Sequence, residues 1–353
     1  MTILRYIAGS LLTFLVLTSC SVAARDNQME QKLDRAFEAG ELRGLHSVLV
    51  IHKGHILAER YYEGEDESSG TSIGARLPDA TSLHDIRSVT KSITGLLYGI
   101  ALSEGLVPGL DAPLIAEFPE YPELAKEPMR QKILVRHALS MKMGTKWSED
   151  LPYTDTRNSE TAMELAEDRN RYVLNRLMVS VPGDRWVYNG GATAIIARLI
   201  SKGVGKPLDV YAKEKLFAPL GIEVFEWASG DDGVPLAASG LRLNIHDLAK
   251  IGQLILDDGK WEERQIVPAD WLRASFTPEA DLASGLRYGL FWWLAGEGEP
   301  PRWVAGFGNG GQRLMINPSD QMVFVVFAGN YNQPDAWELP VKILIDYVLP
   351  TLR

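Results

Sequence analysis

A long apolar segment that begins directly after Ser88 constrains the fold more than any other part of the sequence. Residues 89–102 carry apolar side chains at helical spacing, with no proline and only two glycines among them. Gly105 follows this segment and predicts where the helix ends. The sequence therefore predicts a buried helix that starts at Ser88.

Lys91 follows Ser88 by three positions, which places both side chains on the same face of that helix. A serine hydroxyl beside a lysine amine can act as a nucleophile beside a base, provided that the amine is neutral when it accepts the proton. Burial lowers the pKa of a lysine, and we expect the apolar helix to do so for Lys91. A helix-capping serine followed by a surface lysine is the common alternative. The apolar residues that follow Lys91 favour the catalytic interpretation.

The N-terminus is typical of an export signal, with Arg5 before an apolar run that is too short to span a bilayer. Cys20 is the only cysteine of the chain, and the residues before it resemble the lipobox of bacterial lipoproteins. We therefore expect residues 1–19 to be a lipoprotein signal peptide and Cys20 to carry the lipid. The protein would then be anchored to a membrane of the bacterial cell envelope, facing the periplasm or the exterior. Ordinary cleavage after Ala24 is the alternative.

The composition is that of a globular protein, with 46% hydrophobic and 23% charged residues. The net charge of −10 argues against nucleic acid as a partner, because such interfaces require clustered lysine and arginine. A polar run over residues 63–79 is expected to form a surface loop.

Strand patterns occur near both ends of the chain, and helical patterns lie between them. The order indicates an α+β fold, with one antiparallel sheet interrupted by a mostly helical insertion. Strands are expected at residues 46–52, 56–62, 312–317 and 322–328. Helices are expected at residues 28–40, 133–141, 161–178, 192–201, 208–217, 245–256, 268–276 and 336–348.

Two further segments carry candidate site residues. Tyr188 precedes the helix expected at residues 192–201, where the helix dipole would favour a phenolate, so Tyr188 is a candidate proton shuttle. An ordinary packed tyrosine is the alternative. The irregular stretch 146–158 is rich in aromatic side chains, and we expect Trp147 and Tyr153 to line a site there.

Two ligand-binding patterns are rejected. His46 and His52 share one face of a strand, but His55 lies beyond a turn on the other face, so these histidines predict no metal site. Three glycines in residues 306–311 match a dinucleotide fingerprint, but a strand pattern follows them where that motif requires a helix. No metal or nucleotide cofactor is expected.

The sequence resembles the penicillin-recognising serine hydrolases, in the branch related to class C β-lactamases, serine esterases and 6-aminohexanoate-dimer hydrolases. The resemblance extends from about Leu45 to Leu349. It implies a β-lactamase/transpeptidase-like fold in which an active site lies between a sheet domain and a helical domain. The motifs that carry the resemblance are Ser88 with Lys91, residues 135–141, residues 188–191, residues 238–243 and residues 306–312. The implied boundaries are residues 25–105 and 260–353 for the sheet domain and 106–259 for the helical domain.

The resemblance also implies roles for individual residues. Ser88 would attack an acyl carbon, Lys91 would be its activating base, and Tyr188 would be the second acid or base. The backbone amides of Ser88 and Asn309 would form the oxyanion hole. The residues expected to line the substrate are Trp147, Tyr153, Asn189, Phe307, Gly308 and Gly310.

Two positions depart from the family pattern. Gly190 stands at the third position of the Tyr-x-Asn motif, and Gly306 stands where relatives carry lysine or histidine. Because that cation helps to bind a substrate carboxylate, its absence favours neutral substrates. We therefore expect a serine hydrolase that acts on a small-molecule ester or amide. The alternatives are a penicillin-binding protein or weak β-lactamase, and a non-catalytic lipid-anchored binding protein of the same fold.

Overall fold

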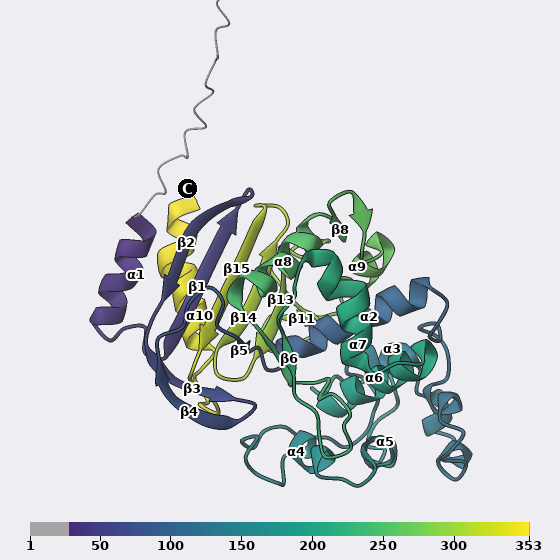
Figure 1. Ribbon diagram of the computed structural model, residues 1–353. Coiled ribbons are helices and arrows are strands. Elements are labelled where there is room, and N and C mark those ends of the chain that lie inside the picture. Colours follow the sequence, from purple (N-terminus) through teal and green to yellow (C-terminus); the bar gives the residue numbers. More distant parts are fainter. Residues whose placement is uncertain (1–27, 353) are drawn as a thin grey trace, which may run out of the picture.

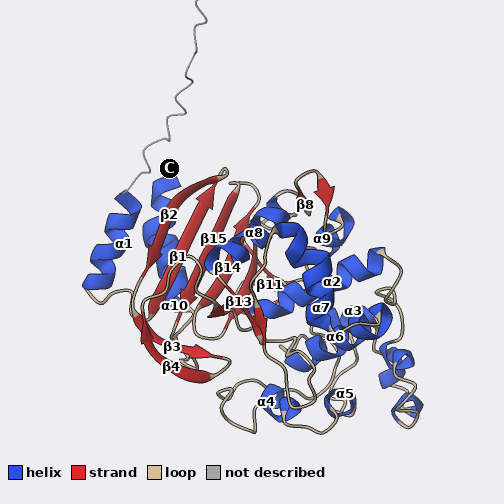
Figure 2. Ribbon diagram, viewed as in Figure 1, coloured by secondary structure: helices blue, strands red, loops and turns tan. Residues whose placement is uncertain are grey.

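The computed structural model describes residues 28–352. A large antiparallel sheet forms one side of the molecule and most helices gather on the other (Figures 1 and 2). The sheet has eight strands in the order β10-β11-β12-β13-β14-β15-β1-β2. Strand β1 (Leu45–His52) pairs with β15 (Met322–Ala328), so strands from the N-terminal and C-terminal parts of the chain lie side by side near one edge of the sheet. The expected α+β fold is confirmed.

The strands with strong patterns lie where the sequence predicts them. Strand β2 (His55–Tyr61) follows β1 through Lys53 and Gly54, whose φ angles of 51° and 78° match a two-residue hairpin turn. Strand β14 (Gln312–Asn317) and β15 have the expected bounds, and β13 (Trp303–Gly308) precedes them. Three short strands were not predicted, because two or three residues show no alternation: β10 (Ala280–Asp281), β11 (Arg287–Tyr288) and β12 (Trp293–Ala295).

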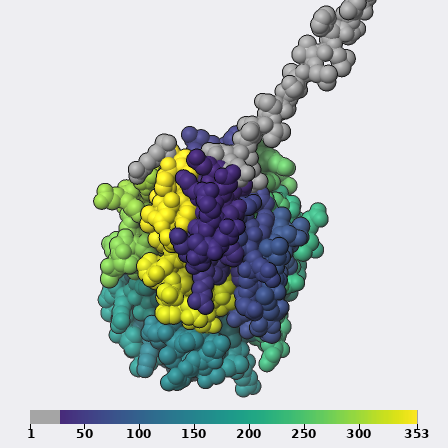
Figure 3. All heavy atoms as spheres, turned by 90° about the vertical axis from the view of Figure 1, so that its left-hand side faces the viewer, coloured from purple at the N-terminus to yellow at the C-terminus, as the bar shows by residue number. Residues whose placement is uncertain are grey.

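Helices cover both faces of the sheet, and β15 shows why. Its alternate side chains Val323 and Val325 pack in one apolar cluster, while Phe324 and Val326 pack in another. The first cluster includes residues of α2 (Val89–Ser103) and α8 (Ile245–Leu256). The second includes α1 (Gln28–Glu38) and the C-terminal helix, which lie side by side in Figure 3. That helix comprises α10 (Glu338–Lys342) and its continuation Ile343–Val348.

Helix α2 lies at the centre of the larger apolar cluster and is buried from Val89 to Ala101. Gly99 is needed there, because a side chain at this position would collide with the Trp271 ring of α9 (Ala269–Ser275). The predicted buried helix after Ser88 is confirmed.

The helical part contains one long helix and several short ones. The helix expected at residues 161–178 is wrong, since two short helices occur there, capped by the side chains of Asn158 and Asp168. The helices of this part are α3 (Val135–Leu139), α4 (Ser159–Glu164), α5 (Arg169–Leu174), α6 (Gly190–Val204) and α7 (Leu208–Ala212), which continues over Lys213–Phe217.

The polar run at residues 63–79 is not a plain loop. It forms a hairpin of β3 (Gly64–Ser68) and β4 (Thr71–Arg76), which the sequence did not reveal because most of its side chains are polar. A small three-stranded sheet follows the order β5 (His84–Asp85), β7 (Leu241–Leu243), β6 (Glu226–Trp227), and β8 (Lys260–Trp261) pairs with β9 (Arg264–Gln265).

Within residues 28–352, no helix combines the length and apolar character needed to cross a membrane. The predicted signal peptide and Cys20 lie outside the described residues.

Candidate active site

Ser88 and Lys91 meet at the start of α2, as their spacing predicts. Ser88 is the N-cap residue of the helix, and its Oγ accepts a hydrogen bond of 2.9 Å from Lys91 Nζ. The Lys91 side chain is 1% exposed, and Nζ also donates to the carbonyl oxygen of Ala238 at 3.0 Å. The preceding residue, Arg87, has a φ of 49°, so the chain turns sharply into the helix at the serine.

Glu160 is a third member of this group that the sequence did not reveal. Its carboxylate comes from α4, is 3% exposed, and places Oε2 at 3.2 Å from Lys91 Nζ. Burial alone would lower the pKa of Lys91, but the negative charge of Glu160 raises this pKa above its usual value. The pKa of Lys91 is therefore shifted in the direction opposite to the one expected from burial in an apolar helix.

The position of Glu160 explains the departure at Gly190. A side chain at position 190 would collide with the Glu160 carboxylate. Gly190 occupies the third position of the expected Tyr-x-Asn motif. The carboxylate of Glu160 fills this space, so Lys91 has an anionic neighbour.

Tyr188 completes the group around the nucleophile. Tyr188 lines a cavity together with Ser88, and Lys91 Nζ lies 5.0 Å from the Tyr188 ring centroid. The ring is half-buried, and burial of the hydroxyl raises the pKa of Tyr188, while Lys91 opposes this shift. Tyr188 therefore rests as a phenol, and the helix dipole does not produce the expected phenolate.

Glu149 is a second carboxylate that the sequence did not reveal. Its Oε1 accepts hydrogen bonds from Trp147 Nε1 at 2.7 Å and from the Gly190 amide at 2.6 Å. Its Oε2 accepts one of 2.8 Å from the Tyr153 hydroxyl. Burial, followed by the charge of Glu160, raises the pKa of Glu149 to about 7. The site thus contains a carboxyl group that titrates near neutral pH.

Two cavities of about 310 Å³ and 240 Å³ meet at Ser88. Ser88, Tyr153 and Asn309 line both of them. We call the larger one the polar lobe, whose wall includes Glu67, Ser69, Gly70, Arg87, Glu160 and Ser239. We call the smaller one the aromatic lobe, whose wall includes Tyr188, Trp293, Phe307, Gly308, Gly310 and Arg313.

Most residues that were expected to line the substrate do lie on these walls, and two do not. Trp147 is 6% exposed, packs against Gly191, and donates a hydrogen bond to Glu149. Asn189 is 3% exposed and caps α6, since its Oδ1 accepts a hydrogen bond of 3.0 Å from the Ala192 amide. Both residues lie behind the walls and support them.

The glycines of the third motif face the nucleophile helix. A side chain at Gly306 would meet Val89 and Ser92 of α2, and one at Gly308 would meet the backbone of Ile86. These glycines allow β13 to pack closely against the start of the helix. The face of β13 that carries Gly306 and Gly308 therefore contacts protein.

Arg313 supplies a cation that the third motif lacks. It pairs with Phe307 across β13 and β14, and its guanidinium lies 4.3 Å from the Phe307 ring centroid. The side chain donates a hydrogen bond of 2.8 Å to the Gln312 carbonyl, and within residues 28–352 no carboxylate forms an ion pair with it. Burial lowers the pKa of Arg313 to about 10, so the group is still charged at neutral pH.

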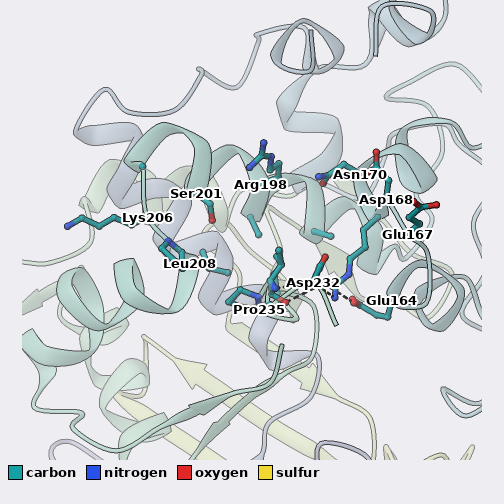
Figure 4. A pocket seen from close by; sticks show the side chains of 18 residues that line it. Glu164, Glu167, Asp168, Asn170, Arg198, Ser201, Lys206, Leu208, Asp232 and Pro235 are labelled. Atoms are coloured by element: carbon teal, nitrogen blue, oxygen red, sulfur yellow. Dashed lines mark hydrogen bonds and ion pairs between the residues drawn. The ribbon is translucent and has the colours of Figure 1, made fainter. Parts of the chain in front are cut away.

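A third cavity of about 470 Å³ lies beside the polar lobe (Figure 4). Glu164 lines both, and Arg169 joins it to Asp232 through ion pairs of 3.0 Å each. Neither Ser88 nor Lys91 is on its wall. This cavity is therefore separate from the catalytic group.

Comparisons with known proteins agree with this geometry. Residues 29–340 match the model of the family described as Beta-lactamase. The 6-aminohexanoate-dimer hydrolase of Paenarthrobacter ureafaciens is 24% identical over 92% of this chain and 82% of its own length.

Solved structures show the same fold. A putative 6-aminohexanoate-dimer hydrolase from Bacillus anthracis superposes with a TM-score of 0.73 at 20% identity, covering 91% of this chain and 81% of its own. EstCE1, a hydrolase with promiscuous acyltransferase activity, superposes with a TM-score of 0.70 at 14% identity, covering 91% of this chain and 97% of its own.

Proposed function

Because the chain belongs to the beta-lactamase family, we propose that this serine hydrolase forms an acyl-enzyme on Ser88 and cleaves a carboxylic ester or a small amide. One observation carries the proposal: Ser88 Oγ lies 2.9 Å from Lys91 Nζ, and Ser88 lines two cavities, one of which it shares with Tyr188. The nucleophile therefore has a proton acceptor within hydrogen-bond distance. It also has space on two sides, one for each half of a substrate.

Proton transfer in the first half of the reaction uses the Lys91 and Glu160 pair. Lys91 rests as an ammonium, so it must lose a proton before it can accept the one from Ser88. The Glu160 carboxylate, at 3.2 Å, is the acceptor within reach. Ser88 Oγ then bonds to the acyl carbon, and the bond from that carbon to the leaving oxygen or nitrogen breaks. The leaving group takes the proton that Ser88 gave up.

The developing negative charge on the acyl oxygen needs hydrogen-bond donors. We assign this role to the backbone amides of Ser88 and Asn309, which line both cavities. The Asn309 side chain is held elsewhere, because its Oδ1 accepts a hydrogen bond of 2.9 Å from the Asn332 amide. In the second half, water attacks the acyl carbon, its proton passes to the Tyr188 and Lys91 pair, and Ser88 regains a proton as it leaves.

The proposal is tested by the mass of the intact protein after brief exposure to p-nitrophenyl acetate and to a fluorophosphonate. We expect one acetyl or one phosphonyl group per chain, located on Ser88 by peptide mapping, and steady release of p-nitrophenol by untreated protein. Adducts on another residue, or release of p-nitrophenol without any adduct dependent on Ser88, would overturn the assignment.

Reaction with β-lactams is a second candidate, and Arg313 favours it. These compounds carry a carboxylate beside the scissile bond, and the Arg313 guanidinium lies in the aromatic lobe next to Ser88. Incubation with a labelled penicillin distinguishes the two activities. A stable label on Ser88 with slow release would favour this candidate over ester hydrolysis.

A further inference from the structure

Three buried side chains converge outside the active site, between separate sheets. His46 belongs to β1, Asp66 to β3 and His84 to β5, and each is at most 2% exposed. His46 Nδ1 lies 2.9 Å from His84 Nε2. Asp66 Oδ1 lies 3.4 Å from His84 Nε2 and 3.7 Å from His46 Nδ1. Three atoms that can each offer a lone pair therefore surround one point.

The protonation of His84 is fixed by its backbone neighbour. Its Nδ1 lies 3.1 Å from the Asp85 carbonyl oxygen, which can only accept a hydrogen bond. Nδ1 must therefore carry the proton. In a neutral imidazole, Nε2 then presents its lone pair toward His46 and Asp66.

In His46 the roles of the two ring nitrogens are exchanged: Nε2 would carry the proton and Nδ1 the lone pair. Its Nε2 is buried, faces the backbone of Gly64 and Gly329, and is attracted by the Glu65 carbonyl, although no well-aligned hydrogen bond forms. A proton on Nε2 leaves the lone pair of Nδ1 facing that of His84 Nε2. Moving the proton to Nδ1 would instead leave a bare Nε2 against a carbonyl oxygen. Neither neutral tautomer of His46 gives both of its nitrogens a suitable partner. A metal cation bound between the two rings would do so.

We propose that His46 Nδ1, Asp66 Oδ1 and His84 Nε2 bind a divalent transition-metal ion, most simply Zn²⁺. Ligands about 2 Å from a tetrahedral Zn²⁺ lie roughly 3.3 Å apart, which is within the range of the three separations given above. Zinc-bound histidines commonly donate their second N–H to a backbone carbonyl, as the His84 ring does here.

The surroundings of Asp66 orient it for this role. Arg76 Nε donates to Oδ2 at 2.6 Å, while Oδ1 accepts a hydrogen bond of 2.8 Å from the Glu67 amide and also faces the two histidines. The Tyr331 hydroxyl donates a hydrogen bond of 3.0 Å to Oδ1 and helps to fix the carboxylate. The ion would thus have two nitrogen ligands and one carboxylate, a donor set typical of zinc.

The site would stabilise one wall of the polar lobe. It links the main sheet, through His46, to the β3 and β4 hairpin that carries Glu67 and Ser69 on that wall. It also holds β5, which leads through Arg87 into Ser88. The ion takes no part in the proposed reaction, and the inference does not depend on that reaction.

The first test measures metal in the wild-type chain. Protein purified without a histidine tag is dialysed against micromolar Zn²⁺ and analysed by elemental mass spectrometry. We expect about one Zn²⁺ per chain, and removal by a chelator should lower the thermal midpoint by roughly 5 °C or more, reversibly on re-addition. Substitution by Co²⁺ should produce the visible absorption of a tetrahedral site. Absence of bound metal after dialysis would overturn the proposal.

The second test locates the ion. His46→Gln and Asp66→Asn should each reduce bound Zn²⁺ at least tenfold and abolish the effect of the chelator. His52→Gln is the matched control, because His52 lies on the same strand outside the cluster. Equal Zn²⁺ content in all three variants would assign the metal elsewhere and overturn the proposal. If the cluster variants fail to fold, the wild-type stoichiometry and Co²⁺ spectrum decide alone. The same metal content in Ser88→Ala would confirm independence from catalysis.

Discussion

The Glu160 carboxylate occupies the space that a side chain at Gly190 would need, and its Oε2 lies 3.2 Å from Lys91 Nζ. This single relationship changes the charge of the lysine that neighbours the nucleophile. With a neutral amide at position 190, burial would be free to lower the pKa of Lys91. With Glu160 beside it, the ammonium form is favoured. The protonation of this pair is therefore expected to control the pH dependence of activity.

Glu160→Gln should shift the acidic limb of the kcat/KM profile to lower pH. The negative charge of Glu160 raises the pKa of Lys91, so its removal lowers that pKa and frees the amine at a lower pH. We expect a shift of about one pH unit or more, together with lower maximal turnover if Glu160 accepts the lysine proton. Glu167→Gln is the matched control, because Glu167 is exposed, lies just after α4 and lines neither lobe. If the acidic limb of the kcat/KM profile stayed at the same pH, the pKa of Lys91 would not determine that limb.

Glu149→Gln should stabilise the protein at high pH. The pKa of Glu149 is about 7 in the folded state, above its ordinary value of 4.5. The folded state therefore binds more protons between these values, and stability falls as the pH rises from about 4.5 to 7. Glutamine keeps an acceptor for Trp147 and cannot ionise, so the gain should be near zero at pH 4.5 and about 1 to 3 kcal/mol at pH 8.

Urea unfolding of the Glu149→Gln variant at these two pH values measures the effect. Glu263→Gln, at an exposed turn, serves as the control and should change stability equally little at both. A gain that is the same at pH 4.5 and pH 8 would contradict a raised pKa of Glu149.

Ser88→Ala should abolish ester hydrolysis without unfolding the protein. The loss of one member of a catalytic unit commonly costs on the order of a million-fold in turnover. Lys91 would keep its contacts with Glu160 and Ala238, so the thermal midpoint should change by only about 2 °C. Calorimetry and single-turnover kinetics check both expectations. Ser103→Ala, at the far end of α2, should retain full activity.

Cys20→Ala should release the protein from the membrane fraction or leave it as an unprocessed precursor. This outcome follows from acylation of the only thiol in the chain. Fractionation combined with an intact-mass measurement checks it. Ordinary cleavage after Ala24 would instead give the same soluble product with and without the cysteine.

The parts of the fold that could be predicted are those with strong periodicity. Helix α8 and strands β14 and β15 have the bounds that their apolar patterns indicate. The break between α4 and α5 could not be predicted in this way, because it depends on Asp168. This side chain caps α5 and also accepts a hydrogen bond of 2.8 Å from Tyr121, which is distant in the sequence. Tertiary contact decided where that helix begins.

The same limit applies to the candidate site. Ser88 and Lys91 could be paired from the sequence because helix geometry relates positions three apart. Glu160 follows Lys91 by 69 positions, and no spacing rule connects a carboxylate on one helix to an amine on a distant helix. The expectation of a lowered pKa for Lys91 failed for this reason: it considered the apolar helix and omitted the acid that the fold brings to it.

Arg313→Met should lower kcat/KM for substrates that carry a negative charge, relative to neutral substrates. The guanidinium lies in the aromatic lobe with Ser88, and within the described part of the chain it has no carboxylate partner, so a substrate anion can take that place. The preference for neutral acyl groups, inferred from Gly306, therefore needs revision, because the cation is on the neighbouring strand. A charged hydrogen bond contributes about 1.5 to 3 kcal/mol, which corresponds to roughly 10-fold to 100-fold in kcat/KM.

Two ester pairs measure this effect: phenyl acetate against 3-acetoxybenzoate, with the charge on the leaving group, and p-nitrophenyl acetate against p-nitrophenyl hemiglutarate, with the charge on the acyl group. Arg313→Met should lower kcat/KM for the charged member of at least one pair and leave both neutral esters nearly unchanged. Arg302→Met is the control, since this exposed arginine is paired with Asp320 at 3.3 Å outside both lobes. Equal losses on charged and neutral esters would show that Arg313 only supports the Phe307 ring, on which it is stacked.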